Sequence, residues 1–84
     1  MRSILVYSKP DCRYCTLAKN LLAEKGMSYQ ETVIGTGMLR EDFMATFPEV
    51  QTLPLIIVNG NKIGGYNDLV EYIKNEQSQT FLAE

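Results

Sequence analysis

Histidine and tryptophan are absent from this 84-residue chain, and cysteine occurs only twice. A zinc site needs about four ligands, and the chain has neither a histidine nor a third cysteine, so only a metal shared between two chains stays open. A disulfide with a purely structural role is also disfavoured. Cys12 and Cys15 are three positions apart, and a disulfide across so short a loop removes little chain entropy from the unfolded state. These shortages favour redox chemistry for the cysteine pair.

A strong charge of one sign and long apolar runs are lacking too. The net charge is -2 without a basic cluster, which argues against a nucleic-acid surface, and no apolar run is long enough to span a bilayer. The start of the chain does not have the pattern of a signal peptide. We therefore expect a cytoplasmic protein, in a reducing compartment where a Cys-x-x-Cys is more often catalytic than structural. Residues 1–84, 45% of them hydrophobic, should form a single domain, which we expect to be a monomer with no membrane partner.

What is present is a Cys-x-x-Cys where a strand pattern gives way to a helix pattern. Residues 4–7 form a short apolar run, and a helical repeat follows at Tyr14, Leu17, Ala18, Leu21 and Leu22. Cys12 therefore lies at a helix start, where backbone N–H groups lack partners and the helix dipole favours a thiolate. We expect Cys12 to have a lowered pKa and to be the nucleophile, and Cys15, one turn deeper, to attack the resulting mixed disulfide.

The whole pattern predicts an α/β domain with the element order β-α-β-α-β-β-α. Strands are expected at residues 3–8, 28–34, 55–58 and 62–63, and helices at 13–25, at 40–47 and after Gly65. The first two strands, joined through a helix, should be parallel with a right-handed crossover. The result is a four-stranded mixed sheet with three helices on both faces, in which Phe43, Met44 and Phe47 are core residues. Residues 77–84 show no clear pattern and are expected to form a loose tail.

Turn and capping residues separate these elements. Asp11 is expected to cap the first helix, and Gly26 to end it in the left-handed conformation. Asn59-Gly60 is typical of a type I′ hairpin turn. Asp68 and Glu71 have the spacing of a capping box for the third helix.

The chain resembles a glutaredoxin of the thioredoxin fold over about residues 4–74. The resemblance rests on Cys12-Arg-Tyr-Cys15, Thr52-Leu53-Pro54, Gly64-Gly65 and Asn67-Asp68. It implies an enzyme of electron transport and cell redox homeostasis, which reduces protein disulfides and glutathione mixed disulfides through a redox-active dithiol. Glutathione is then the co-substrate, and no metal or bound cofactor is needed. Protein substrates such as ribonucleotide reductase belong to the family, but the sequence does not choose among them.

The resemblance also implies a glutathione site. Its expected residues are Lys9, Tyr14, Thr52, Leu53, Pro54, Gly65, Asn67 and Asp68. A cis Pro54 would leave the backbone of Leu53 free to pair with the cysteinyl part of glutathione, as in strand addition. A proline that merely starts a strand fits the sequence equally well.

Both ends of glutathione have expected partners. The helix start at Gly65 would hold the γ-glutamyl carboxylate, with Asp68 near the ligand's amine. Simple capping by Asp68 is compatible with this, since a carboxylate has several acceptor sites. Lys9 and Tyr14 would meet the glycine carboxylate, with weaker support for Arg40 or Gln51. Lys9 is equally consistent with a solvated charge.

Two departures from the family stand out. Arg13 replaces a common proline and adds a positive charge that would tune the pKa of Cys12, unless its side chain points to solvent. Tyr66 stands where many relatives have a third cysteine. Two other functions stay open: a redoxin reduced by thioredoxin reductase, and an iron–sulfur carrier in which two chains and two glutathiones hold a cluster. The presence of Cys15 and Arg13 argues against the carrier.

Overall fold

A computed structural model describes the backbone of residues 2–82 and the side chains of residues 2–76. The elements are β1 (Ile4–Ser8), α1 (Arg13–Glu24), β2 (Gln30–Val33), α2 (Arg40–Thr46), β3 (Leu55–Val58), β4 (Asn61–Gly64) and α3 (Tyr66–Leu82). The four strands lie in the order β2-β1-β3-β4, with β1 parallel to β2 and antiparallel to β3. The predicted mixed sheet, its parallel first pair and its element order are confirmed.

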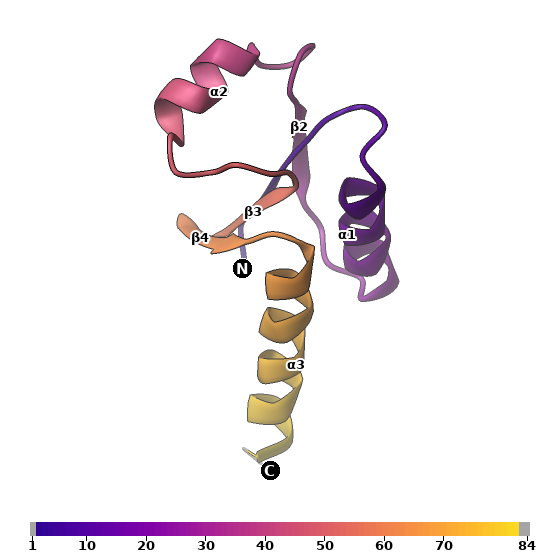
Figure 1. Cartoon of the computed structure of the whole chain (residues 1–84). Helices are drawn as coiled ribbons and strands as arrows, with labels where there is room; N and C mark the ends of the chain where they lie inside the picture. Colours follow the sequence, from indigo (N-terminus) through magenta and orange to yellow (C-terminus); the bar gives the residue numbers. More distant parts are fainter. Residues whose placement is uncertain (1, 83–84) are drawn as a thin grey trace.

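Helices cover both faces of the sheet, as predicted (Figure 1). α1 and α3 pack on one face through the larger core, and α2 packs on the other. The larger core contains Ile4, Val6, Ala18, Leu22, Ile56, Val58, Leu69 and Ile73. All four residues of β3 are buried, because this central strand has a helix layer on each side.

Three aromatic side chains hold the short helix α2 on its face of the sheet. The rings of Tyr7, Phe43 and Phe47 lie with centroids 5.3 to 5.5 Å apart. Phe43 is buried, whereas 54% of Met44 is exposed. The prediction that Met44 belongs to the core is wrong, because successive residues of a helix point about 100° apart and only one of this pair can face the sheet.

The predicted turns are confirmed, while the elements differ by a few residues at their ends. Gly26 has a φ of +67°, and Asn59 and Gly60 both have positive φ values, of 52° and 83°. β2 is shorter than predicted and β4 is longer, since β4 includes Gly64.

Both predicted helix caps are wrong in position. Asp11 adopts a left-handed φ of 55°, and Cys12 itself is the N-cap residue of α1. α3 begins at Tyr66, with the carbonyl of Gly65 accepting the first helical bond from Leu69. Asp68 is therefore in the third helical position and not at the cap.

The C-terminal helix is longer than predicted. α3 continues to Leu82, where the sequence predicted a tail without regular structure, and it runs away from the sheet (Figure 1). Residues 83–84 of that predicted tail lie outside the described residues. Over residues 2–82, no helix combines the length and apolarity needed to cross a bilayer.

Candidate active site

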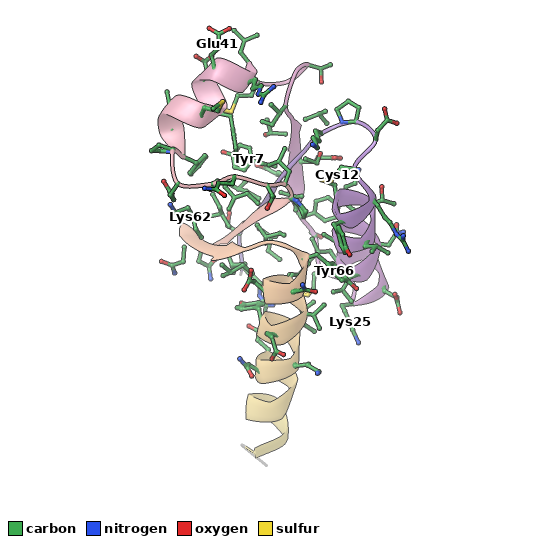
Figure 2. The ribbon with its side chains drawn as sticks, viewed as in Figure 1. Tyr7, Cys12, Lys25, Glu41, Lys62 and Tyr66 are labelled. Carbon is green, nitrogen blue, oxygen red and sulfur yellow. A yellow bond between two sulfur atoms is a disulfide. The ribbon has the colours of Figure 1, made fainter. Side chains whose placement is uncertain are left out.

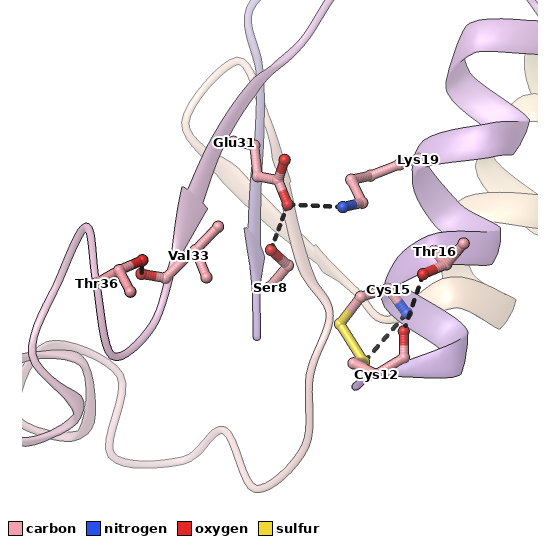
Figure 3. Close-up of polar contacts among 8 residues, drawn as sticks. All are labelled: Ser8, Cys12, Cys15, Thr16, Lys19, Glu31, Val33 and Thr36. Carbon is pink, nitrogen blue, oxygen red and sulfur yellow. Dashed lines mark hydrogen bonds and ion pairs between the residues drawn. A yellow bond between two sulfur atoms is a disulfide. The ribbon is translucent and has the colours of Figure 1, made fainter. Parts of the chain in front are cut away.

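The two cysteines form a disulfide at the start of α1 (Figure 3). Cys12, in extended conformation at the N-cap, accepts a hydrogen bond at Sγ from the backbone N–H of Cys15, with an N–S distance of 3.1 Å. An N–H directed at this sulfur stabilises a thiolate there. Cys12 is partly exposed, whereas only 1% of Cys15 is exposed. A disulfide substrate can therefore reach Cys12 and not Cys15, which is compatible with the predicted roles of the two cysteines.

The segment before β3 lies directly beside Cys12. The Cys12 Sγ is 3.7 Å from the carbonyl oxygen of Leu53, and the Leu53–Pro54 peptide bond is cis, as expected. Among the described residues, none forms a backbone hydrogen bond with the N–H or carbonyl of Leu53. This backbone edge is therefore open to a ligand next to the reactive sulfur.

The start of α3 lies close to the same segment, at Pro54. A Cβ placed on Gly65 would lie 3.5 Å from the carbonyl oxygen of Pro54, so the two segments approach closely. The Asp68 carboxylate accepts a hydrogen bond from the Gly65 N–H at 3.0 Å. It also lies so close to Gly64 that a Cβ there would be 2.2 Å from Asp68 Oδ2. Asp68 thus stabilises the start of α3, and its exposed carboxylate can also accept a hydrogen bond from a ligand.

A cleft of about 610 Å³ opens on the α2 side of Leu53. Of the predicted site residues, Lys9, Thr52 and Leu53 line it, together with Arg40 and Gln51. Its other lining residues are Pro10, Ile34, Gly35, Phe43, Met44, Pro48 and Val50. The cleft thus brings together Lys9 and Arg40, the two cationic residues that the sequence analysis suggested for the glycine carboxylate of glutathione.

Tyr14 lies outside this cleft. Its ring is 6.0 Å from the ring of Tyr66, which lies at the first turn of α3 (Figure 2). The structure therefore does not bring Tyr14 into the cleft with Lys9, and a contact of Tyr14 with the glycine carboxylate stays a prediction. The exposed Asn67 follows Tyr66 in α3, near Asp68. Arg13 is exposed in the first turn of α1, and its effect on Cys12 stays a prediction.

A smaller cleft of about 470 Å³ lies at the far end of α1. It is lined in part by Arg2, Lys25 and Glu76 and by none of the predicted site residues. Among the residues that the structure describes, no three Cys, Asp or Glu side chains gather closely enough to hold a metal ion.

A polar cluster that the sequence analysis missed joins β1, β2 and α1 (Figure 3). The buried Ser8 hydroxyl donates to Glu31 Oε2 at 2.5 Å, and Lys19 Nζ lies 2.9 Å from the same oxygen. The Ser8 hydrogen bond, followed by the Lys19 interaction, holds the pKa of Glu31 below its ordinary value of 4.5. No periodicity predicts such a contact, because its residues come together only when β1 and β2 pair.

The Glu31 cluster should make stability depend on pH. A carboxyl whose folded-state pKa is lowered stabilises the fold above its unfolded-state pKa, and this contribution is lost as the pH falls through the folded-state pKa. Glu31→Gln should therefore lower the free energy of unfolding at pH 7 by about 1 kcal/mol, and the difference from the unmodified protein should shrink as the pH falls below 4.5 through the lowered pKa of Glu31. Urea denaturation at pH 7 and at a series of lower pH values measures this. Glu71→Gln, which removes an exposed α3 carboxylate, is the matched control and should show no such pH-dependent difference.

Comparison with known proteins identifies the family. The family model described as glutaredoxin matches residues 4–63. The chain is 36% identical over 69 residues to glutaredoxin 3 of Escherichia coli K12, covering 82% of this chain and 83% of that protein. The chain belongs to the glutaredoxin family.

Two further similarities agree with this result. The hybrid peroxiredoxin hyPrx5 of Haemophilus influenzae is 36% identical over 70 residues, which cover 83% of this chain and only 29% of that longer protein. The structure of a buckwheat glutaredoxin–glutathione complex aligns with a TM-score of 0.71 at 24% identity, covering 89% of this chain and 71% of that one. The similarity to the buckwheat structure shows that the two proteins share a fold.

Proposed function

We propose that this glutaredoxin is a glutathione-dependent thiol–disulfide oxidoreductase of protein disulfides and glutathione mixed disulfides. The observation that carries the proposal is the accessible sulfur of Cys12 at the N-cap of α1, bonded to the buried Cys15 and beside the open backbone of Leu53. An accessible thiolate with a second thiol behind it is the arrangement that thiol–disulfide exchange requires.

The reaction proceeds in two exchanges. The Cys12 thiolate attacks one sulfur of the substrate disulfide, so that a Cys12–substrate disulfide forms and the other substrate sulfur leaves as a thiolate. Cys15 then attacks Cys12, which releases the second substrate sulfur as a thiolate and forms the Cys12–Cys15 disulfide. Two glutathione molecules reduce that disulfide and become glutathione disulfide. The Cys15 N–H, 3.1 Å from Cys12 Sγ, stabilises the thiolate that begins and ends each cycle.

Glutathione would bind across Cys12 with its cysteinyl backbone against Leu53. Lys9 and Arg40 in the cleft offer positive charge to its glycine carboxylate. The start of α3 offers backbone N–H groups and the positive end of the helix dipole to its γ-glutamyl carboxylate. The buckwheat relative, described in a glutathione complex, supports this choice of co-substrate.

A comparison of electron sources tests the function. We expect turnover of a glutathione mixed disulfide with glutathione, glutathione reductase and NADPH, and little turnover when thioredoxin reductase replaces the glutathione system. The opposite preference would reject glutathione dependence and support the redoxin alternative.

Replacing Asp68 should separate binding from chemistry. Asp68→Ala should raise the apparent KM for glutathione mixed disulfides and cost about 1 kcal/mol of stability, through the lost bond to the Gly65 N–H. The rate at which iodoacetamide alkylates Cys12 should hardly change, because the carboxylate acts on the ligand and not on the sulfur. A large fall in that alkylation rate would contradict a role in binding.

A further inference from the structure

The cleft beside Leu53 has two chemically different parts. Lys9 and Arg40 contribute cations to its lining, whereas the lining contains no acidic residue. Phe43, Met44 and Val50 contribute an apolar wall. The cationic part suffices for the carboxylate of glutathione, but glutathione has no apolar side chain to fill the rest.

Met44 is the accessible member of this apolar wall. It is 54% exposed although it lies one residue after the buried Phe43. Phe43 is held against Tyr7 and Phe47, so α2 presents Met44 to the cleft from a fixed position. A flexible, polarisable side chain of this kind is well suited to contact varied apolar partners.

We propose that this cleft binds the peptide around the reactive cysteine of a protein substrate, and that it selects peptides with a large apolar residue and an acidic residue next to that cysteine. The inference rests on the thiol–disulfide exchange proposed above and adds the substrate class. Charge complementarity to Lys9 and Arg40 calls for an acidic residue, and the Met44 wall calls for an apolar one. The open backbone of Leu53, next to Cys12, favours an extended peptide as the occupant.

The reach of a peptide agrees with this assignment. Leu53 both lines the cleft and lies 3.7 Å from Cys12 Sγ through its carbonyl oxygen. A chain held by a disulfide to Cys12 and running along Leu53 advances roughly 3.3 Å per residue. Residues within two or three positions of the substrate cysteine can therefore contact α2.

Single-turnover reduction of synthetic peptides tests the proposal. The substrates are homodimeric peptides joined through one cysteine, flanked by Glu and Leu in either order, and matched peptides with Gln and Ser at those positions. The protein is reduced beforehand and used in excess without glutathione, so that no glutathione competes with the peptide for the cleft. We expect the Glu/Leu peptides to be reduced roughly tenfold faster than the Gln/Ser peptides at low ionic strength.

Substitutions at two residues of the cleft should each remove a different part of the rate preference for Glu/Leu peptides. Met44→Ala should remove roughly a fivefold part of it, which reflects the apolar contact, and Met44→Leu should restore that part. Arg40→Gln should remove roughly a twofold part that also disappears at high salt. Two controls should leave the preference intact. Leu39→Ala removes an equally exposed apolar residue outside the cleft, and Lys74→Gln removes an exposed charge on α3.

The outcomes are decisive in either direction. Equal rates for the two kinds of peptide, or a preference that survives both cleft variants, would overturn the inference. If the protein showed either result and still reduced glutathione mixed disulfides with glutathione, the proposed glutathione-dependent function would stand, and only the preference for acidic and apolar peptides would be rejected. Sedimentation of the reduced protein tests the rival occupant, since a dimer that Met44→Ala dissociates would assign the cleft to a second copy and overturn the proposal.

Discussion

Cys12→Ser is expected to abolish turnover of every disulfide substrate, whereas Cys15→Ser should spare one class. Cys12 is the accessible member of the pair and sits at the N-cap of α1 with the Cys15 N–H directed at its sulfur. A serine hydroxyl there stays protonated and cannot replace the thiolate as the nucleophile. The buried Cys15 cannot substitute for it, because only 1% of its surface is exposed.

Cys15→Ser should still reduce glutathione mixed disulfides. That reaction needs one sulfur, since glutathione itself can resolve the Cys12–glutathione intermediate. Reduction of protein disulfides should fall sharply, because the Cys12–protein intermediate then lacks its internal resolving thiol. Coupled assays with each substrate class measure the difference, and mass spectrometry should detect the trapped Cys12–protein disulfide. Equal loss of mixed-disulfide activity in the two variants would rule out the one-sulfur route.

Gly64→Ala, at the end of β4, should destabilise the protein more than the same replacement at any other glycine with a positive φ. Gly64 has a φ of +119°, and an added Cβ would lie 2.2 Å from Asp68 Oδ2. The backbone strain and the displaced carboxylate together should cost about 2–4 kcal/mol. A domain of this size is stable by only about 4–13 kcal/mol, so the melting temperature should fall by more than about 10 °C.

Gly60→Ala is the matched control for this replacement. Gly60 also has a positive φ, of 83°, but nothing lies within 4 Å of an added Cβ. It should therefore show only the cost of a left-handed alanine, about 1–2 kcal/mol. A double-mutant cycle of Gly64→Ala with Asp68→Ala should show a coupling of at least about 1 kcal/mol, because removing the carboxylate removes the collision. Equal melting temperatures for the two glycine variants, with no coupling, would contradict the close approach.

Local pattern was sufficient for the elements and for the position of the two cysteines at the start of a helix. The apolar run of β3, the helical repeat after Cys12 and the Asn59-Gly60 turn depend on neighbouring residues alone, and each was predicted within a few positions. The helix caps were missed, because several candidate residues stood near each helix start. Only the extended backbone of Cys12 and the hydrogen bond from the Leu69 N–H to the Gly65 carbonyl decided which of them would be the cap.

The composition of the cleft was decided by the tertiary structure. Lys9, Arg40 and Leu53 are distant in sequence and meet only because β1 and β3 pair in the sheet and α2 folds over one face. Tyr14, which was predicted with Lys9 to meet the glycine carboxylate, lies outside this cleft against Tyr66, since α1 and α3 share the opposite face. Met44 was predicted to be buried because spacing alone does not show where a seven-residue helix stops facing the sheet.

The sequence by itself therefore determined the position of the cysteine pair and the fold, because a Cys-x-x-Cys at a strand-to-helix junction and a strand-and-helix order are properties of contiguous residues. Only the tertiary structure decided which side chains surround that sulfur. The Ser8–Glu31–Lys19 cluster, the approach of Asp68 to Gly64 and the exposed Met44 wall all depend on the register and packing of distant segments. Those distances are set when the sheet pairs and its two faces are covered, and no local pattern encodes them.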